Sequence, residues 1–130
     1  MPTVRITTVA GKTVQEKQTM VTILTEVIER VMDRHPKYIR VIIDEFAPEN
    51  YALMGITFKD RREGENKDLA QDDFIMEFFI KAGRTPEVID ELSDAFMAEV
   101  KKHPIFAGGD IRIIVTEMAA ANFKIDFYAE

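Results

Sequence analysis

The chain has 130 residues, 46% of them hydrophobic, and a formal net charge of −6 at pH 7. This length suits one domain with its own core, and the acidic balance argues against nucleic acid as the main partner. Cysteine is absent, which excludes disulfides and thiolate chemistry, and no apolar run reaches the roughly 18 residues that a membrane span needs.

The first quarter of the chain predicts a strand followed by a helix. Residues 3–9, "TVRITTV", are rich in β-branched side chains and favour a strand that ends at Gly11. Thr13 and Glu16 form a capping box, which marks the start of a helix. The helix has an apolar stripe made of Met20, Leu24, Val27, Ile28 and Val31. It ends before Pro36, and "YIRVIIDEF" then predicts a second, parallel strand.

Residues 59–73, "KDRREGENKDLAQDD", are dense in charge and poor in apolar side chains. This pattern favours an exposed linker or a hairpin edge. The neighbouring carboxylates of Asp72 and Asp73, like those of Asp44 and Glu45, would point to opposite faces of a strand, so we expect charged surface there and not a metal site.

The remaining residues repeat the order strand, helix, strand. "FIMEFFI" predicts the third strand, and Thr85 followed by Pro86 predicts a capped helix start. The apolar stripe of this helix comprises Val88, Ile89, Leu92, Phe96, Met97 and Val100. "AGGD" then turns the chain into a fourth strand, "IRIIVTEM".

A single offset of 72 residues relates the two halves. It takes Gly11 to Gly83, Thr13 to Thr85, and "IRVIIDEF" to "IRIIVTEM". We therefore predict a single α/β domain over residues 1–130, with repeats at 2–58 and 74–128 joined by the linker 59–73. Right-handed β-α-β crossovers give a four-stranded sheet with two helices on one face. The other face would keep apolar residues at alternate positions, which predicts burial against further copies of the chain.

We expect no targeting segment and no histidine-based metal site. Arg5 and Lys12 interrupt the start of the chain and no apolar segment follows, so no signal peptide is expected and the location is predicted to be cytoplasmic. His35 and His103 lie far apart, and each precedes a proline, which favours a role in a turn.

The chain resembles the 4-oxalocrotonate tautomerase family of the tautomerase superfamily, in a tandem-fused form. The resemblance is carried by Met1-Pro2, the strand to Gly11, the helix "VQEKQTMVTILTEVIERVM" and "IRVIIDEFAPENY". "KAGRTPEVIDELSDAFMAEV" and "IRIIVTEMAAANF" resemble the same unit again. Short family members assemble as hexamers, so the resemblance implies a homotrimer of fused chains.

The resemblance also implies the site residues. The family's catalytic proline falls on Pro2, its arginine after the first-strand glycine on Arg84 and its active-site phenylalanine on Phe123. The second-strand arginine falls on both Arg40 and Arg112, and a further cation before the glycine falls on Lys81. The counterparts of Pro2, Arg84 and Phe123 in the other half are Phe74, Lys12 and Tyr51, so one proline site per chain is implied.

The implied activity is enol–keto tautomerisation of a small 2-hydroxy-dienoate or 2-oxo acid, with Pro2 as general base and no cofactor or metal. A proline nitrogen is basic only once Met1 is removed, and removal is favoured before so small a residue. Nearby Lys81, Arg84 and a strand arginine would disfavour the protonated amine, bind the substrate carboxylate and stabilise a dienolate. Phe123 would keep the site dry.

Two other functions stay open. A hydratase or dehalogenase-like lyase would use protonated Pro2 as an acid, although relatives of that kind have an acidic residue where this chain has Ile125. A non-catalytic oligomeric binding module would follow from a retained Met1. The cations also have ordinary interpretations: Arg40 and Arg112 could pair with Glu45 and Glu117, and Lys81 and Arg84 could be solvated rim charges.

Overall fold

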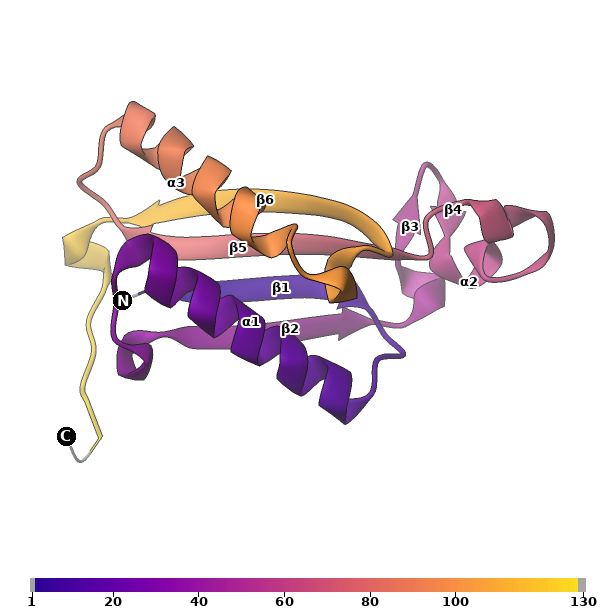
Figure 1. The fold of residues 1–130 in the computed structure, drawn as a ribbon, viewed down its shortest axis with the longest axis horizontal. Coiled ribbons are helices and arrows are strands. Elements are labelled where there is room, and N and C mark those ends of the chain that lie inside the picture. Colours follow the sequence, from indigo (N-terminus) through magenta and orange to yellow (C-terminus); the bar gives the residue numbers. More distant parts are fainter. Residues whose placement is uncertain (1, 129–130) are drawn as a thin grey trace.

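A mixed four-stranded sheet carries two helices on one face (Figure 1), as the sequence predicts. The computed structural model describes residues 2–128. The first repeat contributes β1 (Thr3–Val9), α1 (Val14–Met32) and β2 (Arg40–Phe46). The second contributes β5 (Asp72–Lys81), α3 (Pro86–Val100) and β6 (Gly109–Met118). No helix among the described residues is long and apolar enough to cross a membrane.

The strand order β2-β1-β5-β6 places one repeat on each side of the sheet. β1 is parallel to β2 and β5 is parallel to β6, whereas β1 and β5 run antiparallel at the centre. Thr3 pairs with Phe79, and Thr7 pairs with Ile75. The repeat offset aligns Thr3 with Ile75 and Thr7 with Phe79, so the two pairs are equivalent. The central ladder therefore contains a pseudo-two-fold axis that exchanges the two repeats.

The repeats also share their turns. Gly11 and Gly83 both have φ +126, a conformation that favours glycine, and each ends a first strand. The side chains of Thr13 and Thr85 both cap the following helix. The helices differ in length, 19 residues for α1 and 15 for α3, which is about one turn. The segment from Pro104 to Arg112 is four residues longer than the segment from Pro36 to Arg40, so both second strands return to register.

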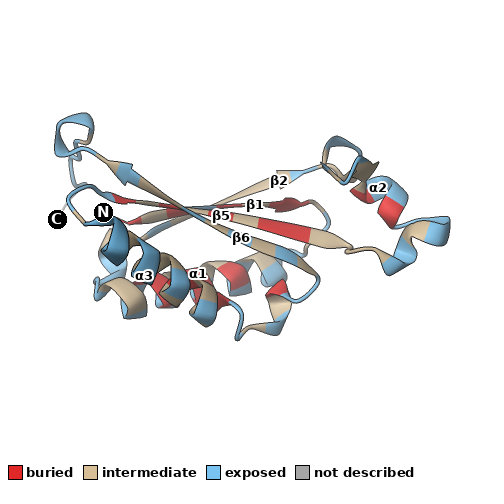
Figure 2. Ribbon diagram, turned by 90° about the horizontal axis from the view of Figure 1, so that it is seen from above, coloured by how far each residue is buried: buried red, intermediate tan, exposed pale blue. Residues whose placement is uncertain are grey.

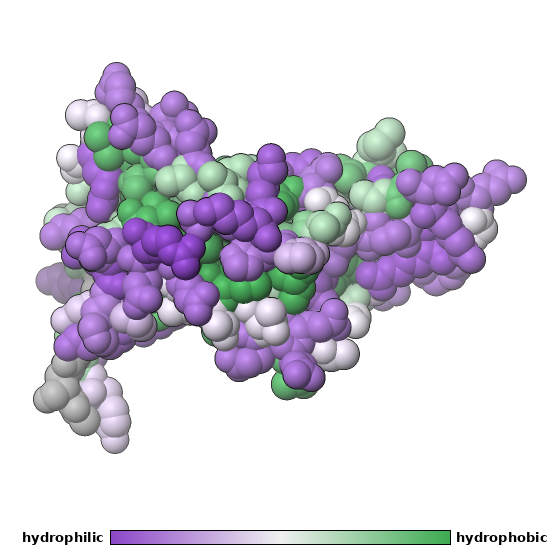
Figure 3. Space-filling view, in the orientation of Figure 1, coloured by the Kyte–Doolittle hydropathy of each residue, from purple (hydrophilic) through white to green (hydrophobic). Residues whose placement is uncertain are grey.

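The core lies between the sheet and the helices (Figure 2). Alternate residues of β1 and β5 point into it, among them Val4, Ile6, Met76 and Phe78. Phe78 stacks on Phe96 of α3, with ring centroids 4.0 Å apart. On the outer side, polar side chains cover the helices, and apolar side chains show between them (Figure 3).

The second face of the sheet is more polar than expected. It presents apolar side chains such as Ile114 and Phe46, which are 45% and 46% exposed. Between them lie an Arg5–Asp44 ion pair at 3.3 Å and a hydrogen bond from Thr116 to Glu77. A partner for this face would therefore have to match charges as well as apolar area.

The charged segment before β5 is largely exposed, but it has a structure of its own. It follows the short hairpin β3 (Ala52–Leu53) and β4 (Ile56–Thr57) and contains α2 (Phe58–Arg61). Arg61 is buried, lies over the Phe58 ring, and donates hydrogen bonds to the carbonyls of Leu53, Ile56 and Ala70. The guanidinium thus donates to three backbone carbonyls. The density of charge in the sequence could not predict this buried position of Arg61.

We expect Arg61→Ala to weaken this segment. Its three carbonyl partners would lose their donor, which should lower the free energy of unfolding by about 2–3 kcal/mol in urea denaturation. The control is Arg62→Ala, because Arg62 is exposed and only donates at 3.4 Å to the Ala10 carbonyl. Equal stability of the two variants would contradict a structural role for Arg61.

Candidate active site

The strand directions give the sheet two chemically different ends. The starts of β1 and β2 meet the ends of β5 and β6, and this edge is called the Pro2 end. The starts of β5 and β6 meet the ends of β1 and β2, and this edge is called the Phe74 end. The pseudo-two-fold axis relates one end to the other, so each could hold one copy of the site.

Pro2 precedes the first residue of β1 and is buried. Its carbonyl accepts a hydrogen bond of 3.2 Å from the backbone N–H of Arg40, which begins β2. The parallel pairing of β1 with β2 thus places Arg40 beside Pro2 within one chain. Met1, on which the basicity of the Pro2 nitrogen depends, lies outside the described residues.

Lys81 and Arg84 lie where β5 ends. Lys81 is exposed, and the Arg84 guanidinium donates a hydrogen bond of 2.8 Å to the Lys81 carbonyl. Gly83 turns the chain between them. Because Thr3 pairs with Phe79, the end of β5 adjoins the start of β1, and both cations belong to the Pro2 end.

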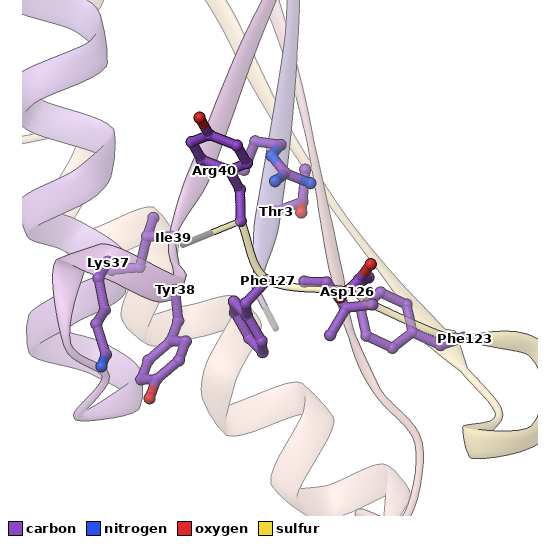
Figure 4. Close-up of a pocket in the computed structure, with 10 residues that line it drawn as sticks. Thr3, Lys37, Tyr38, Ile39, Arg40, Phe123, Asp126 and Phe127 are labelled. Carbon is purple, nitrogen blue, oxygen red and sulfur yellow. The ribbon is translucent and has the colours of Figure 1, made fainter. Parts of the chain in front are cut away.

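Phe123 lies between two pockets at this end. One has a volume of about 150 Å³ and is lined by Lys81, Met118, Ala120 and Phe123. The other, of about 220 Å³, is lined by Thr3, Arg40, Phe123 and the segment after it (Figure 4). Pro2 is not among the residues that line these two pockets. The structure thus gathers Pro2, Arg40, Lys81, Arg84 and Phe123 at one end of the sheet.

Sequence reasoning missed the aromatic wall of the larger pocket. Tyr38 packs edge-on against Phe127, with ring centroids 5.9 Å apart, and both line it. Figure 4 shows these two rings beside the stem of Lys37. The only signal in the sequence is the aromatic residues of the C-terminal segment, and no local pattern says where that segment packs.

Arg112 lies at the Phe74 end, away from the other candidates. Its Nη1 contacts both carboxylate oxygens of Asp73, at 2.9 and 3.2 Å, and Tyr51 donates a hydrogen bond of 2.6 Å to the same carboxylate. The alternative pairing with Glu117 is not observed, and Glu45 pairs with Lys17 instead of Arg40.

The prediction that Asp72 and Asp73 form a charged surface is wrong. The side chain of Asp73 is 2% exposed, and that of Asp72 is 19% exposed. Asp72 accepts hydrogen bonds from Lys12 at 2.6 Å and from Thr8 at 2.9 Å. Both carboxylates form ion pairs with cations of the same chain, Asp72 with Lys12 and Asp73 with Arg112. Within residues 2–128 no cluster of three or more metal-ligating side chains occurs.

The two ends differ in electrostatic state. Within the described part of the chain, no carboxylate forms an ion pair with Arg40, Lys81 or Arg84. At the Phe74 end both Lys12 and Arg112 are paired. The Pro2 end therefore has positive charge available for an anionic ligand, next to an apolar wall.

Comparisons with known proteins agree with this architecture. A family model described as "Tautomerase enzyme" matches residues 2–61. Among solved structures, native fused 4-OT is similar with a TM-score of 0.70 and 19% identity, over 95% of this chain and 91% of that chain. Pt0534 inactivated by 2-oxo-3-pentynoate has a TM-score of 0.70 and 15% identity, over 95% and 90%.

A third similar structure is FG41 malonate semialdehyde decarboxylase inhibited by 3-bromopropiolate. Its TM-score is 0.66 at 16% identity, over 95% of this chain and 88% of that chain. Comparison with curated proteins gives no match. Structural likeness at these identities establishes the fold, and the family match covers the repeat that contains Pro2. The first repeat therefore matches the tautomerase family model, and the chain as a whole has the fold of the fused 4-OT structures.

Proposed function

We propose that the protein is a cofactor-independent tautomerase that interconverts enol and keto forms of a small 2-hydroxy-dienoate or 2-oxo acid. The observation that carries the proposal is the group of cations without carboxylate partners beside the start of β1. A chain that begins with proline carries a secondary amine at its N-terminus. This amine can act as a base without a metal.

The proposed reaction moves one proton. After removal of Met1, the Pro2 nitrogen takes the proton of the substrate's enol hydroxyl or of a carbon next to its carbonyl. Electrons move into the conjugated system, which becomes a dienolate, and the Pro2 ammonium returns the proton to a different carbon. Cations at this end disfavour the protonated amine before the reaction and stabilise the dienolate that forms.

Each neighbouring residue has a proposed role. Arg40 lies next to Pro2 and can hold a carboxylate through two parallel hydrogen bonds. Lys81 and Arg84 hold the other polar end of the substrate, at the edge where the smaller pocket opens. Phe123 separates the two pockets and excludes water from the reacting carbons. Arg112 has no role in this proposal, because Asp73 holds it at the other end.

Two alternatives differ from this proposal in chemistry. A lyase of the hydratase or dehalogenase kind requires a protonated Pro2 and a residue that activates water, and Ile125 in the larger pocket cannot do so. The similar malonate semialdehyde decarboxylase extends the lyase class to loss of carbon dioxide. A binding module remains the expectation for a chain that keeps Met1.

We also propose that the chain assembles as a homotrimer of two-unit chains. Residues 2–58 and 74–128 are the proposed units, and 59–73 connects them. Similar structures are described as fused 4-OT symmetric and asymmetric trimers. The second face of the sheet offers Ile114 and Phe46 for contact, together with the ion pair between Arg5 and Asp44. Burial in a trimer would remove this apolar area from water.

We expect Pro2 to be the group that 2-oxo-3-pentynoate modifies, because a free secondary amine can add to the activated alkyne. The processed chain should gain the mass of one reagent molecule, located on Pro2 by peptide mass spectrometry, and should lose turnover of a 2-hydroxy-dienoate. Pro2→Ala should lower turnover by about 10²-fold or more, the usual contribution of a positioned base.

The matched control is the same chain with Met1 retained, in which the Pro2 nitrogen is an amide. It should neither react with the alkyne nor turn over the substrate. Equal activity of the retained and processed forms would eliminate Pro2 as the base, whatever residue the reagent modifies.

Light scattering should give three times the 14.9 kDa mass of one chain. Ile114→Glu, on the second face of the sheet, should shift the mass toward that of a single chain, because it buries an unpaired charge in the contact. Val14→Glu is the control, since Val14 is 82% exposed at the start of α1. A trimer that tolerates both substitutions equally would place the contact elsewhere.

A further inference from the structure

The Phe74 end has counterparts of three of the candidate binding residues of the Pro2 end. The repeat offset aligns Phe74 with Pro2, Arg112 with Arg40, and Tyr51 with Phe123. The same offset aligns Lys12 with Arg84. A cation on the second strand, a cation after the glycine and an aromatic side chain therefore surround the start of β5 as well.

Three carboxylates, of Asp72, Asp73 and Asp110, distinguish this end from the Pro2 end. The offset places Asp73 opposite Met1 and gives Asp72 no counterpart at all. Asp110, whose carboxylate lies 3.9 Å from the Arg112 guanidinium, is aligned with Tyr38. The second repeat thus has acidic residues, Asp72 and Asp73, at the first two positions of β5.

Asp73 binds the cationic and aromatic residues of this end as a carboxylate ligand would. Its two oxygens accept from Arg112 at 2.9 and 3.2 Å and from the Tyr51 hydroxyl at 2.6 Å. Asp72 accepts from Lys12 at 2.6 Å, from Thr8 at 2.9 Å and from the Asp73 backbone N–H at 2.9 Å. The residues that could hold an external anion therefore already hold internal ones.

We propose that Asp72 and Asp73 are internal ligands that close the second repeat's anion site, so that the chain binds external carboxylates at the Pro2 end alone. The statement about the Pro2 end rests on the proposed function, whereas closure of the Phe74 end rests on the contacts of Asp72 and Asp73. An external carboxylate must displace a tethered one, whose effective concentration is roughly millimolar or higher. Asp73 then determines how many carboxylate ligands one chain binds.

Oxalate is a suitable probe, because it is a small dicarboxylate that does not tautomerise. Calorimetric titration should give one oxalate per wild-type chain and two per Asp73→Asn chain, since the amide removes the closer of the two carboxylates that pair with Arg112. Asp110→Asn is the matched control and should stay at one, because Asp110 is exposed and only approaches Arg112 at 3.9 Å. Arg40→Met should remove the wild-type equivalent.

The outcomes separate this inference from the proposed function. No binding to wild type and one equivalent to Asp73→Asn would remove the proposed ligand at the Pro2 end and still support closure by Asp73. Two equivalents on wild type, one of them surviving Arg40→Met, would overturn closure. So would identical stoichiometry for wild type and a folded Asp73→Asn, with circular dichroism as the check on folding.

Tyr51 provides a second readout that needs no substitution of Asp73. Burial and the hydrogen bond to Asp73 raise the pKa of the Tyr51 phenol above its ordinary 10.0, whereas Arg112 lowers it and Asp72 raises it. The raised value belongs to the folded state, so the stabilisation by this phenol is complete below about pH 10 and is lost as pH rises through the folded-state pKa.

Absorbance titration of wild type against Tyr51→Phe isolates this phenol. We expect it to ionise above its ordinary pKa, and excess oxalate should leave its ionisation unchanged, because oxalate does not displace Asp73. Ionisation at the ordinary value, or a shift on adding oxalate to wild type, would show that Asp73 does not occupy the site permanently. In a folded Asp73→Asn variant the ionisation should move to lower pH.

Discussion

The antiparallel pairing of β1 with β5 is the constraint on which the rest of the molecule depends. Each repeat alone is a strand, a helix and a parallel strand. Two strands and one helix are not enough to enclose a core. Joining them through β1 and β5 makes one sheet and puts Val4, Ile6, Met76 and Phe78 under both helices. The same pairing brings the start of β1 to the end of β5, which places Pro2 and Lys81 at the same edge of the sheet.

The pseudo-two-fold axis through this ladder creates two related ends, and charge distinguishes them. At the Pro2 end Arg40, Lys81 and Arg84 have backbone contacts but no carboxylate partner among the described residues. At the Phe74 end Lys12 and Arg112 are neutralised by Asp72 and Asp73. An ion pair at 19% or less exposure on its acidic side is poorly screened by solvent, so these carboxylates hold their cations more firmly than surface pairs do. The repeat gives two related ends, and the two acidic residues at the start of β5 make the ends electrostatically different.

The segment between the repeats shows how a charged sequence can still be ordered. Arg61 is buried among backbone carbonyls and over the Phe58 ring, without a carboxylate partner among its described contacts. Three carbonyls and an aromatic face together replace the water that the guanidinium loses. The rings of Phe46, Tyr51 and Phe58 continue this contact to the end of β2, so the segment is anchored at the Phe74 end. Tyr51 belongs both to this anchor and to the ligands of Asp73.

The sequence by itself determined the elements and their repetition. Residues 3–9 form β1, the capping threonines start both helices, and the offset of 72 residues is reproduced in the turns at Gly11 and Gly83. These features follow from periodicity, capping and glycine conformation, which are local properties of the chain. Only the tertiary structure decided that Arg40 lies beside Pro2 while Arg112 does not, that Asp73 is buried, and that Tyr38 and Phe127 wall a pocket. Those outcomes depend on which strand ends meet and which charges desolvate one another, and contacts between residues far apart in the chain have no local signature.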